Sequence, residues 1–169
     1  YLYAVKLDRA QLGLGLVSLI ICIGLASALW HHNQSVLGDL LDTLAIAGFA
    51  GLTAFFLLRQ ILSVRSHRIF AFTIVAAIAL ILEHMPLLNG SLGYVFLFAV
   101  AIVTLLLVAK RITDLIIVIA ALLFTALILR TFDIAWCEQF PHGTHFLWHI
   151  VIAAAAASLS VFLLRYCKN

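Results

Sequence analysis

Six long apolar segments, joined by short polar connections, make up almost the whole of this sequence. A helix needs about 20 mostly apolar residues to cross the hydrocarbon core of a bilayer. No backbone polar group can be left without a partner in that core, so the crossing segments must be helical. We therefore predict an all-α polytopic transmembrane helical bundle with six spans. The spans are expected at residues 10–30, 40–58, 69–82, 92–108, 112–129 and 145–164.

The scarcity of charged residues excludes a water-soluble fold. Only 10% of the 169 residues are charged and 66% are apolar, whereas an ordinary soluble domain has about 25% charged residues. The connections between the segments are too short to hold a soluble domain, so residues 1–169 are predicted to form a single integral-membrane helical domain. The lipid bilayer is therefore the first partner that we expect.

The positions of lysine and arginine predict the orientation of the bundle. Nine of the ten basic residues lie on one side of the predicted spans, and Arg130 is the exception. Positively charged connections usually stay in the cytoplasm, so both ends of this chain are expected to be cytoplasmic. The net charge of +3 is then a topological signal, and we expect no nucleic acid among the partners.

Six of the seven histidines lie on the opposite, non-cytoplasmic side. His145 and His149 are four residues apart at the start of the last span, so they share one helix face. This spacing allows two imidazoles to bind one zinc ion. His31, at the end of the first span, is the candidate third ligand, which predicts a metal site near the non-cytoplasmic face.

Two more polar residues are expected at the same depth. Ser27 is four residues before His31, and Asp42 follows a short connection near the start of the second span. The alternative interpretation is that these residues cap helix ends, with Asp42 near a helix N-terminus, where a negative charge is favoured. The tryptophans on this side are separately expected to form an interfacial aromatic belt. They are Trp30, Trp136 and Trp148.

The two polar segments resemble those of a known family. Residues 27–31, Ser-Ala-Leu-Trp-His, with the following Asp42, are similar to the serine, histidine and aspartate motif of the alkaline ceramidases. Residues 133–137 and 143–149 are similar to the last-span signature of that family. The ceramidases belong to the CREST superfamily of membrane hydrolases. Adiponectin-type receptors of that superfamily share the serine and histidine elements, but the interval from His31 to Asp42 favours the ceramidase branch.

The resemblance implies a zinc-dependent membrane amidase that hydrolyses a ceramide-like lipid to a sphingoid base and a fatty acid. It implies that His31, His145 and His149 bind zinc and leave its fourth position for water. Asp42 would accept a proton from that water and pass it to the leaving amine, and Ser27 would donate a hydrogen bond to the oxyanion. The family has seven spans, so its first span is expected to lie outside this sequence.

Two other functions stay open on the sequence alone. Histidines on different spans can ligate haem iron axially, which would make this chain a haem-binding or structural subunit of a larger membrane complex. The second open function is that of a hydrolase-like protein without turnover, which acts as a receptor or an assembly subunit. Haem would leave Ser27 and Asp42 without a role, so the hydrolase is the favoured interpretation.

Overall fold

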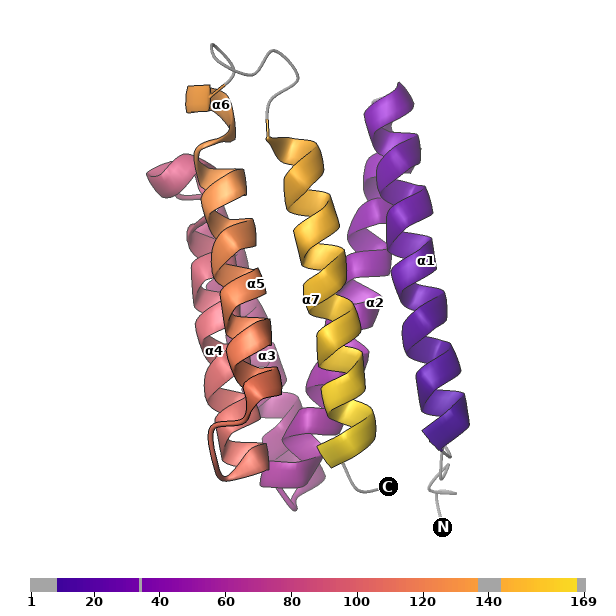
Figure 1. The fold of residues 1–169 in the computed structure, drawn as a ribbon, viewed down its shortest axis with the longest axis vertical. Coiled ribbons are helices and arrows are strands. Elements are labelled where there is room, and N and C mark those ends of the chain that lie inside the picture. The colour runs from indigo at the N-terminus through magenta and orange to yellow at the C-terminus, as the bar shows by residue number, and fades with distance from the viewer. Residues whose placement is uncertain (1–8, 34, 137–143, 167–169) are drawn as a thin grey trace.

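The computed structural model describes residues 9–33, 35–136 and 144–166. They form a bundle of long helices that run along its long axis (Figure 1). Six of these helices are long and apolar enough to cross a membrane, which confirms the predicted all-α bundle. The elements are α1 (Arg9–Asn33), α2 (Val36–Ile61), α3 (Arg65–Glu83), the 3-10 turn η1 (Leu87–Gly90), α4 (Leu92–Ala109), α5 (Asp114–Thr131), the short α6 (Asp133–Trp136) and α7 (His145–Tyr166).

Side-chain caps set helix ends that the apolar pattern did not locate. α2 begins earlier than predicted because the Ser35 hydroxyl accepts a hydrogen bond from the Gly38 N–H at 3.1 Å. α5 begins later than predicted because Thr113 caps it and accepts a hydrogen bond from the Ile116 N–H at 3.3 Å. Such caps satisfy N–H groups that have no partner inside the helix. Hydropathy locates the apolar stretch of each span, whereas the capping residue determines where the helix begins.

The packing order brings the end of α1 to the start of α7. α7 contacts both α5 and α1, α1 also packs along α2, and α4 contacts α3 and α5. α1 begins and α7 ends at the same end of the bundle (Figure 1). The last turns of α1 and the first turns of α7 therefore share the opposite end, where the sequence predicts a polar site.

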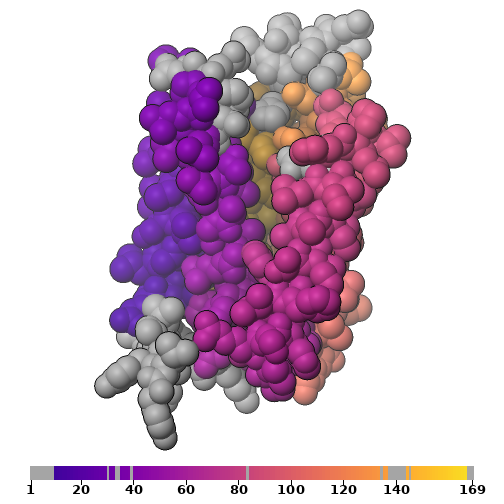
Figure 2. All heavy atoms as spheres, turned by 180° about the vertical axis from the view of Figure 1, so that it is seen from behind, coloured from indigo at the N-terminus to yellow at the C-terminus, as the bar shows by residue number. Residues whose placement is uncertain are grey.

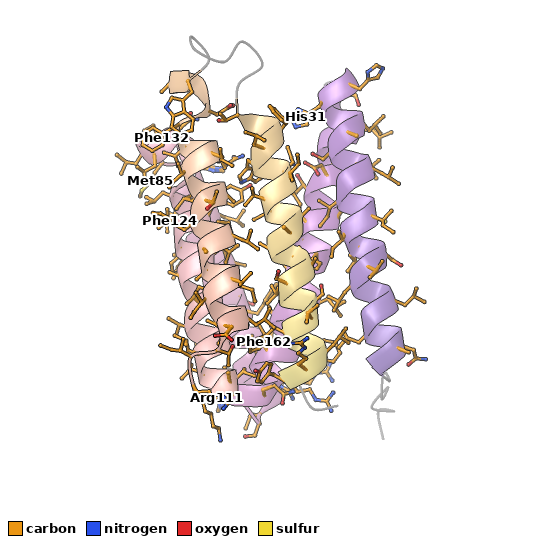
Figure 3. All side chains as sticks on the ribbon, viewed as in Figure 1. His31, Met85, Arg111, Phe124, Phe132 and Phe162 are labelled. Atoms are coloured by element: carbon orange, nitrogen blue, oxygen red, sulfur yellow. The ribbon has the colours of Figure 1, made fainter. Side chains whose placement is uncertain are left out.

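The hydrophobic core lies toward the end of the bundle where α1 begins. Leu16 of α1, Leu105 of α4, Ile119 of α5 and Phe162 of α7 are buried there, and Figure 3 shows Phe162 in the lower part of α7. Lipid tails are as apolar as these side chains, so close van der Waals packing rather than exclusion from water holds the helices together. The buried side chains at the opposite end include polar ones: Ser27, Ser91 and Thr144.

The outer surface of the bundle is apolar. Leu14, Phe70 and Phe124 are 70%, 68% and 65% exposed, and many other large hydrophobic side chains are also exposed. Soluble monomers rarely expose contiguous apolar patches larger than a few hundred Å². This surface is suited to lipid, and the protein is an integral multi-pass membrane protein.

α1 and α2 approach each other closely at Gly48. A Cβ atom there would lie 3.2 Å from Leu19 Cδ2, whereas a Cβ atom at Gly51 would meet nothing within 4 Å. We predict that Gly48→Val lowers the free energy of unfolding by about 1–3 kcal/mol through overpacking. Gly51→Val is the matched control, because it changes helix propensity equally without a close neighbour. Thermal unfolding in detergent measures both, and equal losses would contradict a close contact at Gly48.

Candidate functional site

Ser27 and His31 share one face of α1, in its last turns. Residues four apart in a helix project from the same side. Ser27 is only 5% exposed, and His31 projects from the end of α1 toward α7 (Figure 3). The four-residue spacing therefore places a hydroxyl and an imidazole together at the predicted end of the bundle.

His149 of α7 meets both of these side chains. Its Nε2 atom lies 3.1 Å from Nε2 of His31, although the two residues are 118 positions apart in the sequence. The two rings meet edge to face, with centroids 5.1 Å apart. The Ser27 hydroxyl lies 3.4 Å from Nδ1 and 3.5 Å from Nε2 of His149, at the outer limit of hydrogen bonding. Three of the predicted site residues thus form one polar cluster between two helices.

The separation of the two ring nitrogens suits a shared metal ion. Nitrogen ligands at about 2.0–2.1 Å from a tetrahedral zinc ion lie about 3.3–3.4 Å apart, and the nitrogens of His31 and His149 are 3.1 Å apart. Without a metal, the same distance allows an N–H of one ring to donate to the nitrogen of the other. Axial haem ligands lie on opposite faces of the macrocycle, and nitrogens this close leave no room for haem between them. The geometry of the pair favours zinc over haem.

The remaining predicted zinc ligand, His145, is the first residue of α7, one turn before His149. Its side chain lies outside the described part of the structure. Among the side chains that are described, no group of three His, Cys, Asp or Glu could hold a metal ion. His31 and His149 are therefore the two predicted ligands whose side chains the structure describes, and the binding of zinc by all three histidines stays a prediction.

Asp42 lies in the second turn of α2, at the same end of the bundle. α2 begins directly after its N-cap, Ser35, and the attraction of a helix N-terminus for negative charge is confined to the first turn. The interpretation of Asp42 as a helix cap is therefore wrong. Its side chain is half-buried, and its Oδ1 atom is shielded from solvent. An ionisable side chain in a membrane span usually has a functional role.

A hydrogen-bond network that the sequence did not predict holds the start of α7. The Thr144 N–H donates to Asp133 Oδ1 at 2.5 Å. The Thr144 hydroxyl donates to the Leu129 carbonyl at 2.9 Å and lies 3.3 Å from the same Asp133 oxygen. These contacts join the end of α5 to the helix that carries His149. A threonine directly before a predicted helix is an N-cap signal, which could have drawn attention to Thr144.

Trp148 packs against His149 and is itself in contact with Tyr94 and Arg130. Trp148 is 5% exposed, and its ring centroid lies 4.4 Å from that of His149 and 6.1 Å from that of Tyr94 in α4. The guanidinium carbon of Arg130 lies 4.5 Å from the Tyr94 centroid and 5.0 Å from the Trp148 centroid, within the range of cation–π attraction. Trp148 is buried inside the bundle, so its assignment to the interfacial aromatic belt is wrong.

The fold and the cluster together define a class of protein: a multi-pass membrane bundle with a histidine pair and a buried serine at one end. Comparison with protein-family models, with curated proteins and with solved structures gives no match. The particular activity therefore has to be inferred from the geometry and the chemistry of these side chains.

The contacts of Thr144 lead to a prediction about stability. Thr144→Val keeps the shape of the side chain but removes the buried hydroxyl that bonds to the Leu129 carbonyl and Asp133. We expect it to lower the free energy of unfolding by about 1–3 kcal/mol, the usual cost of leaving a buried polar partner unsatisfied. Thr144→Ser keeps the hydroxyl and is the control. If thermal unfolding shows Thr144→Val to be as stable as wild type, the network does not hold α7.

Proposed function

We propose that this chain is a zinc-dependent membrane amidase that hydrolyses the amide bond of a ceramide-like lipid to a sphingoid base and a fatty acid. The observation that carries the proposal is the 3.1 Å separation of His31 and His149 Nε2 across two helices, with the buried Ser27 hydroxyl beside them. Polar side chains inside a bilayer are costly and usually functional. The similarity of the motifs to those of ceramidases supplies the reaction class.

His31, His149 and His145 are the proposed zinc ligands. Three protein ligands leave one position of a tetrahedral ion open, which is the pattern of catalytic zinc sites. When bound, zinc would polarise a carbonyl oxygen and lower the pKa of a water ligand to about 7. The contact between α1 and α7 already brings the first two histidines to nearly the separation that the ion needs.

Ser27 and Asp42 are the proposed catalytic residues. The Ser27 hydroxyl lies beside His149 and donates a hydrogen bond to the oxyanion that develops as water attacks the amide carbonyl. Asp42 comes from α2, the helix that packs along α1. It accepts a proton from the attacking water and passes it to the leaving nitrogen as the C–N bond breaks. The products are a carboxylic acid and an amine.

An opening in the side of the bundle supports a lipid substrate. Figure 2 shows the face formed by α2 and α3, and in its upper half these helices part so that α7 is visible between them. The same turns of α2 and α3 expose apolar side chains, including Leu41 and Ile81. A lipid amide in the bilayer meets such an opening before a soluble molecule does. By the positive-inside rule, this end lies near the non-cytoplasmic face and both chain ends are cytoplasmic.

Metal analysis tests the ligand set. We expect purified wild type to contain one zinc ion per chain, and His31→Ala and His149→Ala each to retain less than about a tenth of it, because each removes a ligand. His32→Ala is the matched control: it removes an exposed histidine of the same helix and is expected to keep the zinc. Unchanged zinc in the first two variants would contradict the proposed centre, and a Soret band in wild type would favour haem.

Fatty acid release from a panel of lipid amides tests the reaction. We expect Ser27→Ala to lower kcat by roughly 100- to 1000-fold, the usual cost of losing an oxyanion donor, with its zinc content unchanged. Asp42→Asn is expected to lose activity in the same way. Ser18→Ala, at an exposed serine of α1, is the control with normal activity. Zinc without turnover of any amide by wild type would contradict the amidase and favour a receptor-like or structural role.

A further inference from the structure

An apolar groove follows the outside of the bundle between α4 and α5. It encloses about 400 Å³, and all the side chains that line it are apolar, among them Phe98 and Ile102 of α4 and Leu123 and Phe124 of α5. Phe124 projects outward from α5 (Figure 3) and is 65% exposed. The groove lies outside the histidine cluster and has no role in the proposed reaction.

The groove continues toward the basic end of the bundle. A second hollow, of about 520 Å³, shares Val103 with the first and is lined by Leu106, Leu107, Lys110 and Arg111. Val103, Leu107 and Lys110 recur at three- and four-residue intervals, so they follow one face of a helix. One continuous surface therefore runs from an apolar groove to two cations.

The two cations are available to a ligand. Lys110 and Arg111 are both exposed, Arg111 extends away from the foot of α4 and α5 (Figure 3), and neither has a carboxylate partner among the described residues. Lys110 ends α4 with φ at 58°, a left-handed conformation that favours glycine. A lysine at this position places a cation in the turn despite an unfavourable backbone.

We propose that this surface binds one anionic phospholipid, with an acyl chain along the groove of α4 and α5 and the phosphate beside Lys110 and Arg111. Lys110 is eleven positions after Ala99, which lines the groove, a rise of about 16–17 Å along a helix. One leaflet contributes about 15 Å of hydrocarbon, half of the roughly 30 Å core. The distance from groove to cations therefore matches an acyl chain and its headgroup, and the charges are complementary.

Native mass spectrometry of the full chain in detergent tests this site. Titration with dioleoylphosphatidylglycerol is expected to show one tightly bound lipid, with at least tenfold weaker binding of dioleoylphosphatidylcholine. The double variant Lys110→Gln with Arg111→Gln is expected to weaken phosphatidylglycerol binding by roughly tenfold or more. The double variant Arg59→Gln with Arg65→Gln is the matched control. It removes two exposed cations from the same end and is expected to change binding less than twofold.

A groove-filling variant separates the apolar contact from the charges. Ala99→Trp occupies the groove without altering the cations and is expected to weaken both lipids. Equal effects of the two double variants would overturn the proposal in favour of diffuse surface charge. Equal affinity for the two lipids would overturn it as well, and so would normal binding by a folded Ala99→Trp. If Ala99→Trp does not fold, the comparison of the two double variants still tests whether Lys110 and Arg111 bind the phospholipid specifically.

Discussion

The absence of water from the bilayer core governs this structure. Every backbone N–H and C=O in hydrocarbon must find its partner within the chain, so the six apolar segments become helices and their ends carry caps such as Ser35. The same medium makes polar side chains costly. Two buried polar groups at one end of the bundle meet polar partners: Ser27 meets His149, and Thr144 meets Asp133. Each of these contacts joins two helices.

Apolar packing and polar contacts are separated along the bundle. The core around Leu105 and Phe162 lies toward one end, and the histidine cluster lies at the other. Since lipid tails solvate apolar side chains as well as the core does, the core holds the helices by close fit, whereas directed hydrogen bonds locate the start of α7. α2 and α3 can therefore part near the cluster (Figure 2) while the core stays packed. The amidase that we propose would take its substrate from the bilayer, and such a site needs this combination.

The spans were predictable because the thickness of the bilayer imposes a length on each apolar segment. The meeting of Ser27, His31 and His149 was predictable because short connections return each span to the same depth. The contact between Asp133 and Thr144 was not, since the path of the connection between α6 and α7 cannot be inferred from composition. Trp148 was assigned to the membrane interface because the sequence pattern gives the depth of a residue in the bilayer. It does not tell which side of the helix is covered by neighbouring helices.

The two Nε2 atoms of the histidine pair can share either one proton, in a hydrogen bond, or one metal cation. In the first state the Nε2–H of one ring donates to Nε2 of the other across 3.1 Å, and in the second both nitrogens would hold the proposed zinc ion. The two states need nearly the same ring positions, since zinc ligands lie about 3.3–3.4 Å apart. Small zinc domains fold around their metal, whereas here the contact of α1 with α7 and the hydrogen bonds of Thr144 position the pair beforehand. A pair that needs little movement would suit the preorganised catalytic site that we propose.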